Sequence, residues 1–260
     1  MTAPTLAANE PCWCGSGRRY KRCHRIADLD PARAVAAQAQ REAAELAAAA
    51  YVRPGRLSPR REVPAHIVRP DYALDSRGRP GRRESGRPKD AETIELMRVA
   101  GRAAAEVLAS LGAAVRPGIT TDELDAIAHQ GCVDRNGYPS PLGYNGFPKS
   151  LCTSVNDAAL HGLPHDYALR DGDLVSLDFA ASVNGWVADS AISFVVGTAA
   201  PEDTALIDTT SRALDAGIAA AIVGNRVGDI SAAIGAVAHA DGYSVNVDFG
   251  GHGVGRTMHG

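Results

Sequence analysis

Apolar residues recur at helical spacing from about residue 90 onward. Between residues 91 and 115 they predict one helix, and Asp90 precedes it as an N-cap. Residues 116–139 then predict a turn, a capped second helix and a glycine stop. The apolar positions that mark the first helix are Ile94, Met97, Val107, Leu108 and Leu111.

Two strand-like runs follow, and Asn184 and Gly185 join them. Asn-Gly is the dipeptide most typical of a two-residue β-hairpin turn. With these residues as the turn, Ala180 faces Asp189 across the two strands. Asp178 and Asp189 then lie on the same face of the sheet as diagonal neighbours, within reach of a shared cation.

The same order of elements recurs later in the chain. Residues 204–223 predict an apolar helix, and residues 224–244 predict a turn, a capped helix and a second Gly-Tyr pair. Matching positions lie 105 to 107 residues apart, which favours an internal duplication over two unrelated helical pairs. The expected fold is therefore α/β (α+β) with an internal pseudo-twofold repeat, whose second half is incomplete at Gly260.

The first ninety residues differ in composition from the rest. Residues 1–28 form a compact Cys/Gly/Arg module, and residues 29–89 contain an alanine-rich helix and a linker too rich in Arg, Pro and Gly to bury a core. Residues 1–90 carry 18 Lys and Arg against 10 Asp and Glu, whereas residues 91–260 carry 9 against 20. The basic part favours RNA or another polyanion as a partner, although solvated charge on a linker explains it equally well.

Composition also excludes some classes of protein. No run approaches eighteen consecutive apolar residues, and the N-terminus lacks the order of a signal peptide, so we expect a cytoplasmic protein without a membrane segment. Three of the five cysteines lie within residues 12–23, which indicates metal binding rather than disulfides.

The residues most typical of a functional site lie in the predicted hairpin and at three histidines. Two carboxylates inside apolar strands that carry no Lys or Arg are costly to bury, and a divalent cation would resolve that cost. The alternative is that one aspartate caps an exposed edge. His161, His252 and His259 are flanked by Gly or Pro, which favours a site over three separate structural histidines.

Three segments within residues 90–260 resemble the successive signatures of type I methionine aminopeptidases: YPSPLGYNGFPKSLCTSVNDAALHGLP, LDFAASVNGWVADS and GGHGVGRTMH. The resemblance implies the duplicated "pita-bread" fold and a monomeric enzyme with two divalent ions (Co, Mn, Fe or Zn). It also implies removal of the initiator methionine from nascent polypeptides whose second residue is small.

The resemblance also implies roles for individual residues. Asp178, Asp189 and His252 match metal ligands, His161 matches a histidine near the scissile amide, and His259 matches one that stabilises the oxyanion. The side chains that match the methionine pocket are Tyr144, Phe147 and Cys152. The family's two remaining ligands are glutamates downstream of the last histidine, so we expect the chain as given to be inactive or impaired.

The N-terminal module contains Cys12, Cys14, Cys23 and His24 in the spacing C-x-C-x8-C-H, which suits tetrahedral zinc. It resembles the SEC-C zinc motif, which implies one structural zinc ion and a docking role. The neighbouring Arg and Lys residues suggest the ribosome as the partner.

Two alternative functions remain open. The chain could be an inactive pita-bread binding protein that docks through its zinc motif, or an Xaa-Pro aminopeptidase on the same fold. The segment YNGFPKSLCTSVN favours the methionine type, and a comparison of Met-Ala with Ala-Pro peptides separates the two activities.

Overall fold

The computed structural model describes residues 7–12, 16–23, 51–81 and 88–260, together with single positions in the expected alanine-rich helix. The rest of that helix, Cys14 and His24 lie outside the described residues. The chain divides into two compact units, Met1–Tyr51 and Val52–Gly260.

The first unit is built around one tight turn. Pro11 and Arg19 form an isolated antiparallel bridge, and Cys12 N donates a hydrogen bond to Arg18 O at 2.8 Å. A 3₁₀ helix, Tyr20–Arg22, follows and buries Tyr20. The turn brings Cys12 and Cys23 into the same small module, as a zinc motif requires.

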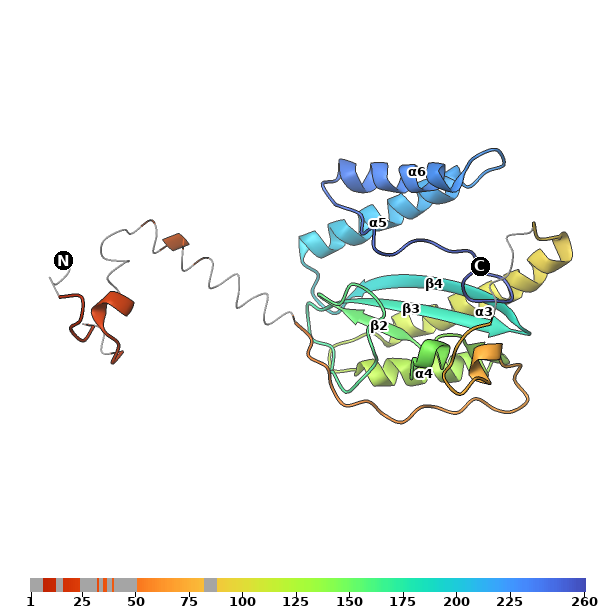
Figure 1. Cartoon of the computed structure of the whole chain (residues 1–260), viewed down its shortest axis with the longest axis horizontal. Coiled ribbons are helices and arrows are strands. Elements are labelled where there is room, and N and C mark those ends of the chain that lie inside the picture. Colours follow the sequence, from red (N-terminus) through yellow and green to blue (C-terminus); the bar gives the residue numbers. More distant parts are fainter. Residues whose placement is uncertain are drawn as a thin grey trace. The chain divides into compact units, whose positions relative to one another are not determined.

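An antiparallel sheet of four strands forms the centre of the second unit (Figure 1). The strands are β1 (Gly137–Pro139), β2 (Cys152–Val155), β3 (Leu174–Val183) and β4 (Trp186–Val195). Strand β3 pairs with β1 and β2 along one edge and with β4 along the other. The predicted hairpin is confirmed in its register, because Ala180 pairs with Asp189, and both turn residues have positive φ, 50° at Asn184 and 80° at Gly185.

Two helices, α3 (Ala91–Ala114) and α4 (Thr121–Val133), cover one face of this sheet (Figure 1). Both predicted caps are confirmed: Asp90 accepts from Thr93 N, and Thr120 forms a capping box with Glu123. Ile94 is 41% exposed because the first turns of α3 extend past the core. The predicted glycine stop is wrong in detail, since Asn136 takes the positive φ and Gly137 already belongs to β1.

The second helix pair is α5 (Pro201–Ala220) and α6 (Val227–Ala240), which pack against each other. Figure 1 shows them on the side of the sheet opposite α3 and α4. The predicted recurrence of two helices is therefore confirmed. Residues 241–260, all of them described, contain no strand. Every helix among the described residues is too short or too polar to cross a lipid bilayer.

Residues 52–81, which we call the strap, correct the prediction of a linker that buries no core. Val63, Ile67 and Tyr72 are buried against Tyr138 and Leu142 of the sheet unit. The strap contributes three buried apolar side chains to this small core, and the sheet unit contributes the side chains that they pack against. The domain expected over residues 90–260 thus extends back to Val52.

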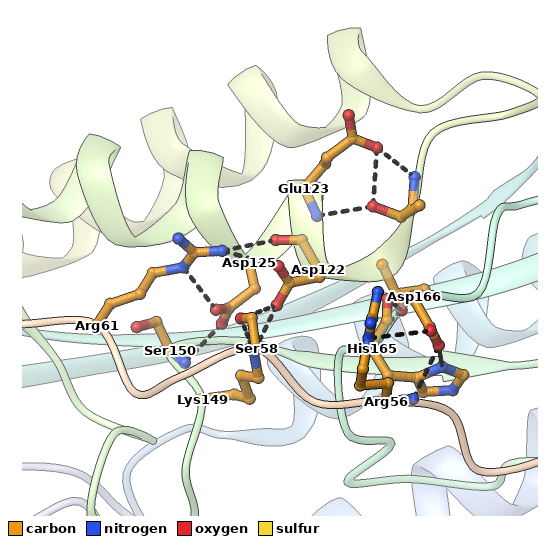
Figure 2. A network of polar contacts seen from close by, with 12 residues as sticks. Arg56, Ser58, Arg61, Asp122, Glu123, Asp125, Lys149, Ser150, His165 and Asp166 are labelled. Carbon is orange, nitrogen blue, oxygen red and sulfur yellow. Dashed lines mark hydrogen bonds and ion pairs between the residues drawn. The ribbon is translucent and has the colours of Figure 1, made fainter.

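Partly buried ion pairs and hydrogen bonds connect the first half of the strap to α4 (Figure 2). Arg61 Nε donates to Asp125 Oδ2 at 3.0 Å, and Ser58 Oγ donates to Asp122 Oδ1 at 2.6 Å. Lys149 completes the network with hydrogen bonds to Asp122 and to Ser58. Arg61 and Ser58, from the segment predicted to be a linker, are therefore partners of α4 carboxylates.

Candidate functional site

A cavity of about 520 Å³ opens on the sheet face where β3 and β4 meet the loops after β1 and β2. It brings together every residue predicted for the active site and the methionine pocket. These are Tyr144, Phe147, Cys152, His161, Asp178, Asp189, His252 and His259. Residues separated by more than a hundred positions thus line one cavity.

The two aspartates form the polar floor of this cavity. Asp178 lies on β3 and Asp189 on β4, in the diagonal relation that the hairpin imposes. Burial and, after it, the neighbouring Asp189 carboxylate together raise the pKa of the Asp178 carboxyl to about 6. Two acidic groups held this close in a partly buried site favour a bound cation.

His252 and His259 come from the glycine-rich segment that closes the chain. Val187 N on β4 donates to Gly255 O at 2.8 Å, which fixes this segment beside the aspartates. His252 Nε2 lies 3.6 Å from Asp189 Oδ2, and the two imidazole rings lie 4.3 Å apart. His252 is therefore directed toward the carboxylate pair, and the His259 ring lies beside the His252 ring.

His161 reaches the cavity from a strained turn. Its φ is 54°, and the next residue, Gly162, packs its backbone directly on β2. Thr153 N donates to Gly162 O at 2.8 Å, and a Cβ at Gly162 would overlap Thr153 O. The glycine after the histidine is thus required to present the imidazole at this place.

The apolar wall consists of Tyr144, Phe147 and Cys152. Cys152 pairs with Asp178 across β2 and β3, and burial raises the pKa of its thiol, with Asp178 adding to the shift. The thiol therefore stays protonated and acts as an apolar surface. Tyr144 has a second role, since its hydroxyl is hydrogen-bonded to His259 Nδ1 at 2.9 Å.

Other lining residues were not predicted. Ala180 lies opposite Asp189 in the hairpin, so the register alone identifies it as part of the floor. Leu163, two residues after His161, and Asn145 also line the cavity. The Tyr144–His259 hydrogen bond joins residues 115 positions apart, and no local pattern indicates it.

Comparison with known proteins identifies the family. Residues 95–260 match the metallopeptidase family M24. The chain belongs to this family. In addition, residues 9–25 of this M24 protein match the SEC-C motif.

The curated relatives of the M24 protein include methionine aminopeptidases. Methionine aminopeptidase 2 of Mycobacterium tuberculosis is 46% identical over 208 residues, which cover 79% of this chain and 72% of the relative. A mitochondrial methionine aminopeptidase 1D of Dictyostelium discoideum is 44% identical over 212 residues, covering 80% and 52%. The chain thus spans between about half and about three quarters of the length of these two relatives.

Solved structures agree with this assignment. The methionine aminopeptidase of Rickettsia prowazekii superposes with a TM-score of 0.66 at 38% identity, covering 66% of this chain and 70% of that one. The prolidase of Pyrococcus furiosus has a TM-score of 0.58 at 22% identity, covering 66% and 50%, and shows the shared fold alone. The pita-bread fold predicted for the M24 protein is confirmed.

Membership of this metallopeptidase family implies divalent metal ions, and the donors in the cavity suit them. Carboxylates and an imidazole are ordinary ligands of Mn, Fe, Co and Zn, and the acidic pair lacks a strong cationic partner among the contacts described above. Within the described ranges, no three His, Cys, Asp or Glu side chains form a group that could hold an ion by itself. The fit therefore rests on two carboxylates that are diagonal neighbours, with His252 beside one of them.

The zinc motif is only partly described. Cys12 is buried, and Cys23 Sγ lies 3.3 Å from Ser16 Oγ. Cys14 and His24 fall outside the described residues, so the four-ligand arrangement in the M24 protein stays a prediction.

Proposed function

We propose that the protein removes the N-terminal methionine from nascent polypeptides whose second residue is small. The observation that carries this proposal is the cavity itself: an aspartate pair and three histidines border one apolar pocket. Relatives named methionine aminopeptidases, at 46% and 44% identity, support the choice of substrate.

Asp178, Asp189 and His252 would hold the divalent ions, which activate water and polarise the scissile carbonyl when bound. Tyr144, Phe147 and Cys152 would receive the thioether side chain, whose flexible, polarisable chain suits an apolar wall. Both the aspartates and this wall line the same cavity, so the scissile bond of a bound methionine would lie near the ions.

His161 and His259 would bind the peptide group that is cleaved. The Tyr144 hydroxyl would donate its hydrogen bond to His259 Nδ1. The neutral His259 ring would then carry its proton on Nε2. That Nε2–H group would donate to the carbonyl oxygen as negative charge develops on it.

Ligand binding tests the proposal without depending on turnover. We expect the protein to bind Mn²⁺ and then free L-methionine in isothermal titration, and Asp178→Asn to weaken both. Asp215→Asn, which changes an exposed carboxyl on α5, is the matched control and should change neither. Equal binding by the Asp178→Asn variant, or no methionine binding by the original chain, contradicts the proposal.

Hydrolysis assays separate the alternatives. A methionine aminopeptidase cleaves Met-Ala-Ser and spares Ala-Pro peptides, whereas an Xaa-Pro aminopeptidase shows the reverse preference. An inactive binding protein cleaves neither and binds no methionine. The predicted impairment of this chain is tested in the same assay.

We further propose that Cys12, Cys14, Cys23 and His24 hold one structural zinc ion, and that the module docks on the ribosome of the cytoplasm. Arg18, Arg19 and Arg22 line one open hollow on its surface, which suits phosphate groups. Metal analysis should give one tightly bound zinc per chain, retained after weaker metals are removed. Cosedimentation with ribosomes should weaken with salt and when the three arginines are changed to serine.

A further inference from the structure

The second half of the strap packs against the loop that carries Tyr144. Tyr72 is buried, and its ring meets the Tyr144 ring edge-on, with centroids 5.1 Å apart at 79°. The Tyr72 hydroxyl donates to Ser140 O at 2.6 Å. Tyr72 therefore contacts both the start of this loop and its central aromatic side chain.

Gly78 makes a backbone contact with the same loop. Asn145 N donates to Gly78 O at 2.8 Å, and Gly78 has a φ of 68°. A Cβ at Gly78 would overlap Gly143 O and lie 2.7 Å from Gly146 N. The strap turn is fixed in turn by Asp75, whose Oδ1 accepts from Arg77 N at 2.8 Å.

The loop connects this contact to the candidate active site. Tyr144 lies between Tyr72 on one side and His259 on the other, with its ring 5.1 Å from each. A second cavity of about 230 Å³ lies against Tyr72 and Gly81 of the strap, and it shares Tyr144 and His259 with the main cavity. The wall between the two cavities thus includes the Tyr144–His259 pair.

We propose that Tyr72 and Gly78 are positioning residues of the candidate active site. They hold the Tyr144 loop, and the Tyr144 hydroxyl then holds the His259 imidazole. Neither strap residue lines the main cavity, so they act on it through the loop that carries Tyr144. The consequence for catalysis rests on the function proposed above for His259, whereas the contact with the loop does not.

Gly78→Ala tests the contact independently of activity. The added methyl group would push the loop away, and we expect the Asn145 amide to exchange with deuterium about tenfold faster while buried β3 amides keep their rates. Gly118→Ala is the matched control, because Gly118 has a similar φ of 87° with nothing within 4 Å of its added Cβ. Unchanged exchange at Asn145, or equal acceleration throughout the unit, overturns the proposal.

Tyr72 variants test the consequence for His259. Tyr72→Leu should lower the kcat that the original chain retains for Met-Ala-Ser about tenfold with little change in KM, as for other residues that orient a catalytic group. Tyr72→Phe keeps the ring contact and should restore most of kcat. A loss confined to KM, or equal losses in both variants, contradicts a positioning role. If the original chain binds no methionine and cleaves no peptide, the proposed function fails, and the exchange experiment still decides whether the strap holds the loop.

Discussion

The side chain of Lys149, including its ammonium group, is fully buried. It donates to Ser58 Oγ at 2.6 Å and pairs with Asp122, which joins the strap, α4 and the pocket loop at one point (Figure 2). Partial burial opposes the ionised form of Asp122, yet Lys149 and Ser58 lower its pKa. Lys149 therefore forms a structural ion pair with Asp122, although its sequence motif also contains residues of the candidate active site.

The variant Lys149→Met keeps most of the volume and removes the charge. It leaves Asp122 and Ser58 without their ammonium partner, so we expect the free energy of unfolding to fall by about 3 kcal/mol. Urea unfolding followed by circular dichroism measures the change, with the exposed Lys21→Met as control. A change below about 0.5 kcal/mol, typical of a surface substitution, would show that the pair contributes little.

His129 gives the fold a dependence on pH. It is buried, Nδ1 is 2.8 Å from Ser150 Oγ, and Nε2 is 2.9 Å from Glu62 O of the strap. Burial lowers its pKa below 6.5, so the unfolded chain binds the proton more tightly than the folded one. The contribution of neutral His129 to stability is therefore fully present above pH 6.5, and it is lost as the pH falls through the pKa that His129 has in the folded chain.

We accordingly expect His129 to lower the free energy of unfolding between pH 7 and pH 5, against an opposite contribution from Asp178, whose raised pKa favours the folded chain as the pH falls. In His129→Gln, which has no titrating ring and can still donate to Glu62 O, this decrease should be smaller. Urea titrations at several pH values measure both slopes. If the two chains show the same slope, other groups cause the pH dependence.

At the scale of elements, the hairpin shows what sequence predicts well. Asn184 and Gly185 have φ of 50° and 80°, which few other residue pairs adopt, and the register that places Asp178 near Asp189 follows from them alone. The capped helices were equally predictable, because each cap lies within three residues of its partner. In both cases the information is local.

Gly185→Ala tests this dependence. An L-residue in the left-handed region costs about 1–2 kcal/mol, so we expect a loss of stability of that size together with weaker Mn²⁺ binding as the strand ends rearrange. Gly172→Ala has a comparable φ of 86° away from the site and should lower stability without affecting Mn²⁺. Mn²⁺ affinity retained by Gly185→Ala would show that the sheet fixes the aspartates without the turn.

At the scale of the whole unit, the strap shows what the sequence could not predict. Its contacts, such as Arg61 with Asp125, join residues 64 positions apart, and composition within the segment gives no sign of them. The site residues were predictable as a set, since each stands in a family motif. Their arrangement was not, because Tyr144 and His259 meet only when two distant loops pack on β3 and β4.

Deletions at two points measure how far the strap belongs to this unit. Removing residues 1–50 leaves the second compact unit intact, so its free energy of unfolding should not change. Removing residues 1–81 exposes the surfaces that cover Val63, Ile67 and Tyr72 and leaves Asp125 without Arg61. At about 1.5–3 kcal/mol for each buried apolar side chain, this deletion should cost at least about 4 kcal/mol, and methionine binding should weaken with it. If the two shortened proteins unfold at the same urea concentration, the strap is an appendage, and the folded unit begins at helix α3.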